Sequence, residues 1–466
     1  MTLTFLGAAR SVTGSSTLLE ADSTSVLVDC GFVQEWDLRG RNWEPFFFDP
    51  GSLDAVILTH AHLDHCGLLP RLVKAGFRGP IHCTAATAEL AAIVLLDSAR
   101  IQEEDAETKR RRHKAEGRSG KHPVVPLYTT TDVETVLPLF TPQPLNSPIE
   151  IGGGALATFH EAGHIFGAAS VLVEAGSGGG RRRVLFSGDV GRWDRPIIRD
   201  PHPFDHADYV VLESTYGDRE HDRHDVEERL AEEVNTTRDA GGNLLIPSFA
   251  LERAQEVLYY LNTLLRADRV PHLVTFLDSP MAARTIEVFQ RHPELFDENM
   301  SALVKRDESP FQFPGLTVVS SVHESKSINH IRGTAVVIAG SGMCTGGRIK
   351  HHLVTNIERP ESTILFVGYQ AKGTLGREIA DGAREVRIFG ATRRVRARVS
   401  RIHGFSGHAD RTELAHWLSA LNEPPRGLLL NHGELSSMEA LRDYLVERAG
   451  APRAIIPEYR ERVELA

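Results

Sequence analysis

The stretch that decides the fold is Thr59-His60-Ala61-His62-Leu63-Asp64-His65, which sets three histidines and an aspartate within six consecutive positions of a 466-residue chain. A single histidine is more often a hydrogen-bonded core residue than a metal ligand. Imidazoles and carboxylates at this density favour a divalent metal instead, and their number points to more than one ion. The stretch therefore predicts a hydrolytic metal site.

The apolar, β-branched residues 55–59 lead into these histidines and predict a buried strand that runs directly into His60. In an extended backbone, His60 and His62 lie on the same side and can meet one ion. Asp64 and His65 follow beyond the turn, where a second ion would bind. A helical backbone would align His60 with Asp64 but separate the two histidines, so it accounts for fewer ligands.

Apolar runs of the same kind recur along the chain, and most end in polar or glycine-containing residues before a helical pattern. The expected strands cover residues 26–30, 55–59, 184–187, 209–213, 243–246, 335–339, 363–367 and 427–430. The expected helices include residues 251–267, 281–291 and 410–422. This alternation predicts an α/β fold whose site residues emerge at the carboxyl ends of strands.

The composition indicates a globular protein, because 41% of the residues are hydrophobic and 24% are charged. The length predicts two or three domains. The net charge of -10 does not indicate an anionic partner, so nucleic-acid binding would depend on local basic patches and bound metal. The four cysteines are scattered without a Cys-x-x-Cys pair, and no apolar run reaches the roughly 18 residues of a membrane helix. We therefore expect a cytoplasmic protein without a membrane segment.

Two segments carry unusual charge. Residues 102–126 hold an acidic run and then a basic run, which predicts either a solvated helix and loop with offsetting charges or a mobile basic arm near the substrate. Residues 387–401 hold six arginines, and these alternate with apolar residues over 395–399. That alternation predicts a strand with one basic face, suited to contact phosphates.

The stretch from His60 to His65 is the hallmark of the metallo-β-lactamase superfamily, and the chain resembles that family at three further places in the expected order. Asp29 ends the run Ser-Val-Leu-Val-Asp-Cys-Gly, His164 lies in Ala-Gly-His-Ile-Phe-Gly, and Asp189 lies in Phe-Ser-Gly-Asp-Val-Gly-Arg. The resemblance implies a two-metal hydrolytic centre.

By this resemblance, most of the site residues bind two divalent ions, with zinc expected and manganese as the alternative. The ligands of the first ion would be His60, His62 and His164. The ligands of the second ion would be Asp64, His65 and His432. Asp189 would bridge the two ions, and Asp29 would orient a ligand from outside.

Motifs later in the chain resemble the β-CASP nucleases of that superfamily. They are Glu213-Ser-Thr-Tyr-Gly-Asp-Arg, then Phe-Ser-Gly-His-Ala-Asp around His408, and Asn-His-Gly-Glu around His432. Residues 246–250, 341–348 and 372–377 also match this branch, so the resemblance extends from residue 3 to about residue 434. The implied fold is a metallo-β-lactamase αββα sandwich, formed by residues 1–208 and 391–466, with an inserted α/β β-CASP domain at 209–390.

The implied function is a metal-dependent ribonuclease that hydrolyses single-stranded RNA, both as a 5′-to-3′ exonuclease and as an endonuclease, and leaves a 5′-phosphate and a 3′-hydroxyl. Asp64, Asp189, Glu213 and His408 would be catalytic, with His408 as the general acid and Glu213 fixing its tautomer. Hydroxyls and guanidinium groups in the insert would hold phosphates. These candidates, for which turn formation is an equal explanation, are Ser248, Arg253, Ser341, Thr374 and Arg377.

Other functions stay open at this stage. One alternative is a DNA nuclease of the same branch. Another is an RNA-binding scaffold subunit without catalytic metal; such subunits usually lack some metal ligands, whereas every expected ligand is present in this sequence. A small-molecule hydrolase would not need the large insert. His403 precedes His408 by five positions, but the motif favours His408. Two residues depart from the family pattern: Ala168 stands where serine is common, and Glu252 stands where glycine is frequent, which puts a backbone contact to phosphate there in doubt. The oligomeric state is not predicted.

Overall fold

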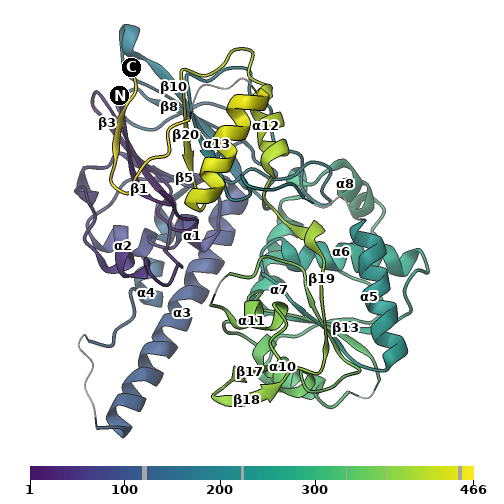
Figure 1. Cartoon of the computed structure of the whole chain (residues 1–466). Coiled ribbons are helices and arrows are strands. Elements are labelled where there is room, and N and C mark those ends of the chain that lie inside the picture. Colours follow the sequence, from purple (N-terminus) through teal and green to yellow (C-terminus); the bar gives the residue numbers. More distant parts are fainter. Residues whose placement is uncertain (118–122, 222–224, 332, 372, 450–453) are drawn as a thin grey trace. The chain divides into compact units, whose positions relative to one another are not determined.

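The computed structural model describes residues 1–117, 123–221, 225–331, 333–371, 373–449 and 454–466. The chain divides into two compact units (Figure 1). The first unit contains Met1–Asp194, Asp200–Glu220 and His408–Ala466, and the second contains Arg195–Arg199 and His221–Gly407. Each unit has its own sheets and its own core.

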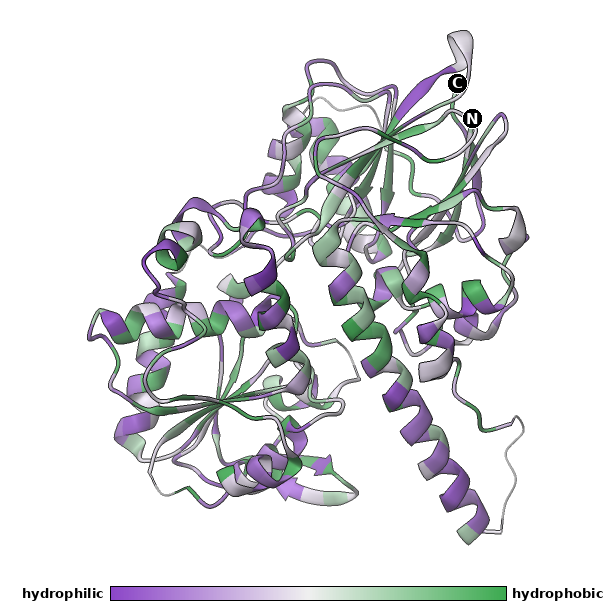
Figure 2. Cartoon of the chain, turned by 180° about the vertical axis from the view of Figure 1, so that it is seen from behind, coloured by the Kyte–Doolittle hydropathy of each residue, from purple (hydrophilic) through white to green (hydrophobic). Residues whose placement is uncertain are grey.

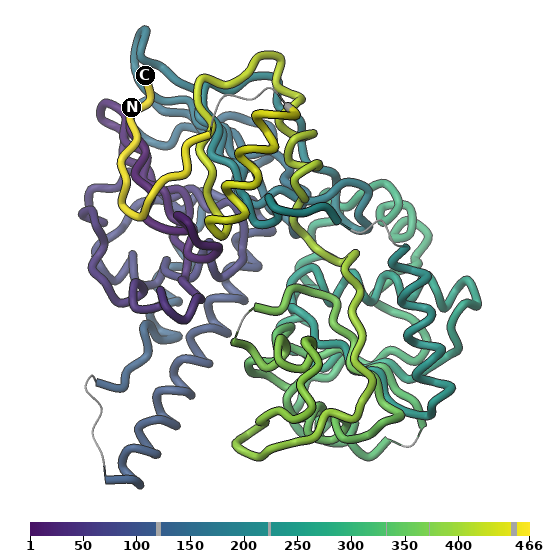
Figure 3. Tube along the Cα trace, viewed as in Figure 1, coloured from purple at the N-terminus to yellow at the C-terminus, as the bar shows by residue number. Residues whose placement is uncertain are grey.

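The first unit is built on two sheets. One sheet runs in the order β21 (Arg462–Glu464), β1 (Thr2–Gly7), β2 (Ser16–Ala21), β3 (Thr24–Val28), β4 (Ala55–Ile57), β5 (Ile81–Cys83) and β6 (Phe140–Pro142). The other runs in the order β20 (Gly427–Asn431), β11 (Tyr209–Glu213), β10 (Arg182–Phe186), β9 (Ala169–Ala175), β8 (Leu156–Glu161) and β7 (Ile149–Glu150). Because β1 pairs with β21, the two ends of the chain lie side by side (Figure 3).

The two sheets pack face to face around one apolar core. Alternate residues of a strand point to the same face, so Leu3, Phe5 and Val26 of the first sheet meet Phe159 and Val171 of the second. The other face of the second sheet is covered by α12 (Arg411–Ser419) and α13 (Leu435–Ala449), which form a further core with it. The short helices α1 (Leu63–Cys66), α2 (Leu69–Lys74) and α4 (Thr130–Glu134) and the long helix α3 (Ala85–Ala115) complete the unit. The predicted αββα sandwich is confirmed.

Helix α3 changes character along its length. It begins at Thr84, whose hydroxyl accepts a hydrogen bond from the backbone N–H of Thr87, and its first half buries apolar side chains. Its second half is exposed and predominantly hydrophilic (Figure 2). Acidic and basic residues there form (i, i+4) ion pairs, Glu107 with Arg111 and Arg112 with Glu116. The helical part of 102–126 is thus the solvated helix of the two alternatives, whereas residues 118–122 of the expected arm lie outside the described residues.

The second unit has one sheet of parallel neighbours with helices on both faces. The sheet order is β14 (Leu316–Val318), β13 (Val274–Asp278), β15 (Ala335–Ala339), β12 (Leu244–Pro247), β16 (Thr363–Phe366) and β19 (Arg398–Arg401). The helices are α5 (Val226–Ala240), α6 (Arg253–Arg266), α7 (Pro280–Arg291), α8 (Glu298–Lys305), α9 (Val322–Ile328), α10 (Ile349–Asn356) and α11 (Leu375–Ala380). A hairpin of β17 (Glu385–Ile388) and β18 (Ala391–Arg394) packs its buried side chains into the core shared with α10 and α11.

The predicted strand with one basic face at 395–399 is wrong. Strand β18 ends at Arg394 and β19 begins at Arg398, because the backbone N–H groups of Arg396 and Ala397 both donate to the carbonyl of Ile357 instead of to a strand. Several of the arginines are also neutralised locally, in the pairs Arg393–Glu358, Arg398–Glu233 and Arg401–Asp381. A continuous cationic face therefore does not form.

A buried carboxylate fastens three elements of the second unit together. Asp278, fully buried at the end of β13, accepts hydrogen bonds from Ser325 Oγ at 2.6 Å, Arg348 Nη1 at 2.5 Å and His352 Nε2 at 2.7 Å. Burial raises the pKa of Asp278, but the hydrogen bonds outweigh it and the pKa lies below its ordinary value. The ionised group thereby holds α9 and α10 against the sheet.

Among the described residues, no helix combines the length and the apolar character that a membrane crossing requires.

Candidate metal centre

The ends of five strands of the first unit supply the centre. Asp29 follows β3, His60 follows β4 by three residues, Asp189 follows β10 by three residues, Glu213 ends β11, and His432 directly follows β20. Strands β3 and β4 are parallel, and so are β10, β11 and β20. Parallel strands bring their carboxyl ends to the same edge, so residues far apart in the sequence meet there.

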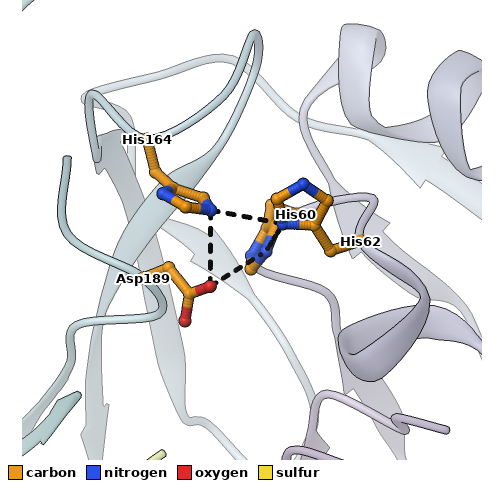
Figure 4. A group of neighbouring side chains, drawn as sticks. All are labelled: His60, His62, His164 and Asp189. Carbon is orange, nitrogen blue, oxygen red and sulfur yellow. Dashed lines mark hydrogen bonds and ion pairs between the residues drawn. The ribbon is translucent and has the colours of Figure 1, made fainter. Parts of the chain in front are cut away.

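The first group of ligand-type side chains consists of His60, His62, His164 and Asp189 (Figure 4). Nδ1 of His62 lies 3.0 Å from Nε2 of His60 and 3.2 Å from Nε2 of His164. Oδ2 of Asp189 lies 3.4 Å from each of those two Nε2 atoms. Three imidazole nitrogens and a carboxylate oxygen therefore lie close together, a donor set that would suit a divalent ion such as zinc.

The second group consists of Asp64, His65 and His432. Nε2 of His432 lies 3.1 Å from Nε2 of His65 and 3.6 Å from Oδ2 of Asp64. Asp64 and His65 reach this group because the backbone turns at His62 into α1, as the sequence predicts. Oδ1 of Asp189 lies 3.3 Å from Nε2 of His65, so the two oxygens of this carboxylate face the two groups separately.

Partners outside the two groups fix the direction of the imidazoles. Asp29 accepts a hydrogen bond from Nδ1 of His65 at 2.7 Å and from the backbone N–H of Thr59 at 2.9 Å. The hydroxyl of Thr59 lies 3.1 Å from Nδ1 of His60, and the hydroxyl of Thr215 lies 3.1 Å from Nδ1 of His432. With Nδ1 engaged in this way, Nε2 of each ring is the nitrogen aimed at the centre.

Thr59 and Thr215 are site residues that the sequence interpretation missed. The only signal for them was position, since Thr59 immediately precedes the first histidine and Thr215 follows Glu213 by two residues. Threonine close to the end of a strand is ordinary, so its role becomes visible only once the imidazole beside it is placed.

The electrostatics of the centre suit a cation. Burial lowers the pKa of His60 well below its usual value, and lowers that of His62 to about 4, so both rings are neutral and can donate lone pairs. Burial alone would raise the pKa of Asp64, but hydrogen bonding to His432 and the charges of nearby imidazoles bring it to about 2. The pKa of Asp189 is likewise held well below its usual value, against its burial, by the surrounding histidines. The carboxylates are therefore ionised.

The hydrogen bonding of one carboxylate oxygen indicates whether these residues fit a metal. Oδ1 of Asp189 is buried and has no hydrogen-bond partner within the described parts of the chain, an arrangement that is costly for a carboxylate. Nε2 of His65 lies 3.3 Å from this oxygen, and Nδ1 of His432 lies 3.7 Å from it. A cation between them would satisfy this oxygen, so the donor set fits a metal.

Beside the metal groups, His408 and Glu213 form a pair. Nδ1 of His408 lies 3.1 and 3.2 Å from the two carboxylate oxygens of Glu213, and the ring of His408 lies 4.4 Å from that of His164. The carboxylate of Glu213 is fully buried, whereas a fifth of the His408 side chain is exposed. Burial lowers the pKa of His408, but the charges of Glu213 and Asp189 outweigh it and raise the pKa to about 9. His408 can thus hold a proton at neutral pH.

His403 joins neither metal group among the residues described. It lies exposed in a 3-10 helix, His403–Phe405, of the second unit.

The five candidate phosphate contacts all lie in the second unit, and each has a local partner. Thr374 caps α11 by accepting a hydrogen bond from the backbone N–H of Arg377, and the exposed Arg377 pairs with Asp381 at 2.5 Å. Ser341 accepts a hydrogen bond from the backbone N–H of Gly346, Ser248 donates to the carbonyl of Phe249, and Arg253 pairs with Glu256. Turn and cap formation therefore explains these residues without a ligand, and their contact with substrate stays a prediction.

The structure shows the surroundings of the two residues that depart from the family pattern. Ala168 is buried at the end of the connection between β8 and β9. Glu252 takes a positive φ of 62° just before α6, a conformation that glycine adopts more readily.

Family models match nearly the whole chain in three parts. Residues 10–226 match the metallo-beta-lactamase superfamily, residues 254–379 match the Beta-Casp domain, and residues 392–457 match a Zn-dependent metallo-hydrolase RNA specificity domain. The last of these segments contains His408 and His432.

Known proteins agree with these matches. A ribonuclease of Thermus thermophilus is 41% identical over 95% of this chain and 95% of its own length. A transcription termination factor FttA of Methanosarcina mazei is 31% identical over 93% of this chain and 67% of its own length, and that of Methanocaldococcus jannaschii is 32% identical with the same coverage. A solved structure of a protein of unknown function from Enterococcus faecalis covers 100% of this chain and 99% of its own, with a TM-score of 0.55 at 13% identity, and shares the fold.

Proposed function

Because the chain belongs to the β-CASP branch of the metallo-β-lactamase superfamily and is a metal-dependent hydrolase, we propose that it is a ribonuclease acting on single-stranded RNA. The observation that carries this proposal is the identity of 41% to a ribonuclease over nearly the full length of both chains. The match of residues 392–457 to an RNA specificity domain supports the same substrate.

We propose that the centre holds two divalent ions, with zinc expected and manganese as the alternative. His60, His62 and His164 would bind one ion, Asp64, His65 and His432 would bind the other, and Asp189 would bridge them. The separate direction of the two Asp189 oxygens supports two ions over one. When bound, such ions lower the pKa of water and neutralise charge that develops on a phosphodiester.

The chain's own residues complete the reaction. Nδ1 of His408 is engaged by Glu213, so Nε2 is the nitrogen that would donate a proton to the leaving 3′ oxygen of the ribose. The oxygen of the attacking water forms a bond to phosphorus as the bond from phosphorus to that 3′ oxygen breaks. The products are a 5′-phosphate and a 3′-hydroxyl, and Glu213 stabilises the charged imidazole before its proton leaves.

We propose that the enzyme digests RNA from the 5′ end and also cuts internally, in the processing and decay of transcripts in the cytoplasm. Four free, buried cysteines are consistent with a reducing compartment. Ser248, Arg253, Ser341, Thr374 and Arg377 would contact the RNA backbone.

The test compares RNA and DNA of the same sequence, labelled at the 5′ or the 3′ end and carrying a 5′-monophosphate or 5′-triphosphate, with zinc or manganese. Mononucleotide release from the 5′ end shows exonuclease activity, and internal fragments show endonuclease activity. Equal cleavage of DNA would reject RNA specificity. Asp189→Ala should abolish cleavage without unfolding the protein, and normal RNA cleavage by that variant would refute the two-ion centre.

His408→Ala separates chemistry from metal binding. We expect slower cleavage with an unchanged metal content, measured by mass spectrometry of the bound ions. Loss of an ion from this variant would make His408 a ligand instead of a proton donor.

A further inference from the structure

The hairpin of β17 and β18 has a two-residue loop of unusual composition. Ile388 pairs with Ala391, which leaves Phe389 and Gly390 as the loop. Their φ angles are 49° and 82°, so both central residues of the turn are left-handed. A turn with two positive φ angles is favoured by Asn-Gly or Asp-Gly, because a bulky side chain at the first position is strained.

Phe389 departs from this rule without a gain in burial. The residue is 56% exposed, whereas Val386 and Ile388 of the preceding strand β17 are buried in the core of the second unit. The hairpin is therefore anchored by its inward residues and does not need an aromatic ring at its tip. Residues that break a local rule are often found at functional sites.

Basic and aromatic groups surround the exposed ring. Nζ of Lys350 lies 4.9 Å from the centroid of Phe389, and the imidazole of the exposed His351 lies 4.7 Å away with its plane tilted by 34°. Both residues come from α10. Arg387, the preceding outward residue of β17, is exposed and donates from Nε to the carbonyl of Gly390, which keeps its guanidinium beside the tip.

The one acidic residue on the outward side of β17 is already neutralised. Glu385 pairs with Arg394 of β18 at 3.5 Å. Arg387 and Lys350 form no ion pair within the described chain, so the tip carries a local excess of positive charge in a protein whose net charge is -10. An aromatic face among cations is the arrangement that binds single-stranded nucleic acid, with a base on the ring and phosphates on the cations.

We propose that Phe389, His351, Lys350 and Arg387 form a stacking platform for one nucleobase of the single-stranded RNA substrate, outside the metal centre. This inference rests on the proposed ribonuclease function. The base lies against the open part of the Phe389 ring, and Lys350 and Arg387 contact the phosphates on either side of that nucleotide. Since every base presents an aromatic face, the platform adds affinity without sequence specificity.

The turn itself supplies the matched variant. Phe389→Asn removes the ring but places the preferred residue at this turn position, so the hairpin should be at least as stable as in the wild type. Phe389→Trp keeps an aromatic face. Val322→Asn, which removes another exposed apolar side chain of the same unit, is the control. The measurements are KM and kcat of the metal-loaded full-length enzyme on single-stranded RNA, and the thermal unfolding midpoint of each variant.

The position of the base is found with RNAs that carry one abasic nucleotide at successive positions. In the wild type, one position should raise KM by roughly 5- to 150-fold, the range expected for one stacked base. In Phe389→Asn, KM should be raised by the same factor on intact RNA, and the abasic nucleotide at that position should add nothing further. Phe389→Trp should restore the sensitivity, and Val322→Asn should behave as the wild type.

Each failure has a distinct meaning. A wild-type enzyme that does not cleave RNA would reject the proposed function itself. If the wild type cleaves RNA, an unchanged KM for Phe389→Asn, or an abasic effect that persists in that variant, would overturn the platform. A lower unfolding midpoint for Phe389→Asn would assign the ring a structural role, and binding of a protein partner lost in this variant with RNA kinetics intact would assign the tip to that partner.

Discussion

Replacing Glu213 with glutamine isolates the charge that stabilises His408. The carboxylate accepts hydrogen bonds from the backbone N–H groups of Val190 at 2.8 Å and Thr215 at 3.3 Å as well as from His408. Glutamine has the same shape but only one accepting oxygen, so its NH2 group must face a donor. The imidazole then loses its charged partner, which lowers the pKa of His408 and weakens its hold on the proton. A hydrogen bond to a charged group contributes about 1.5–3 kcal/mol, which corresponds to a roughly 10- to 100-fold slower cleavage step.

The assay is single-turnover cleavage of RNA with either a normal linkage or a sulfur atom in place of the leaving 3′ oxygen. A thiolate leaves without a proton because its pKa is far below that of a ribose hydroxyl. We expect Glu213→Gln to slow cleavage of the normal linkage and to have little effect on the sulfur linkage. Glu233→Gln, which alters a buried, paired glutamate of the second unit, should lower stability but leave both rates unchanged. Equal losses on the two substrates, or a loss that parallels a fall in bound metal, would refute the assignment of His408 as the proton donor.

Three further perturbations have defined outcomes. Asp29→Asn should weaken metal affinity about 10- to 100-fold, because the variant no longer orients His65 through a charged acceptor. Competition with a chelator measures the metal affinity, and an unchanged affinity would speak against an orienting role of Asp29. Gly31→Ala would place a Cβ atom 1.7 Å from the carbonyl oxygen of Asp64. We therefore expect a loss of about 1–3 kcal/mol in unfolding free energy and a lower metal content. The control is Gly40→Ala, whose Cβ atom would have nothing within 4 Å and should change neither quantity. Asp278→Asn should lower the unfolding free energy by about 2–4 kcal/mol at pH 7, judged by urea denaturation. Because folding lowers the pKa of this carboxyl, its contribution is present above a pH of about 4 and fades as the pH falls further, and a difference between wild type and variant that stays constant in acid would contradict the reasoning.

Some strands could be predicted to the residue because local sequence dictates them. The runs that end at Glu213 and Ala339 are continuous and apolar, and both strands end where the pattern predicts. The separation of His60 and His62 from Asp64 and His65 also followed from sequence, since it depends only on the backbone turn between them. Short-range geometry of this kind is encoded within a few residues.

Features that depend on distant partners could not be predicted. The arginine alternation after Arg394 is interrupted because two backbone N–H groups find the carbonyl of Ile357, a partner nearly forty residues earlier that no local pattern reveals. The hydroxyl of Thr215 has a role only because β20 brings His432 beside it. The buried cluster around Asp278 likewise joins residues from three separate segments, each unremarkable alone.

The order of the centre's residues along the chain determines when the centre can assemble during synthesis. During translation, His60 to Asp189 leave the ribosome first, and then the whole of residues 221–407 must be made before His408 and His432 appear. Until then the second sheet of the first unit lacks β20, its edge strand, and the group of Asp64 and His65 lacks its third member. A nascent chain that has not yet reached His432 therefore cannot assemble the complete second group of ligand-type side chains.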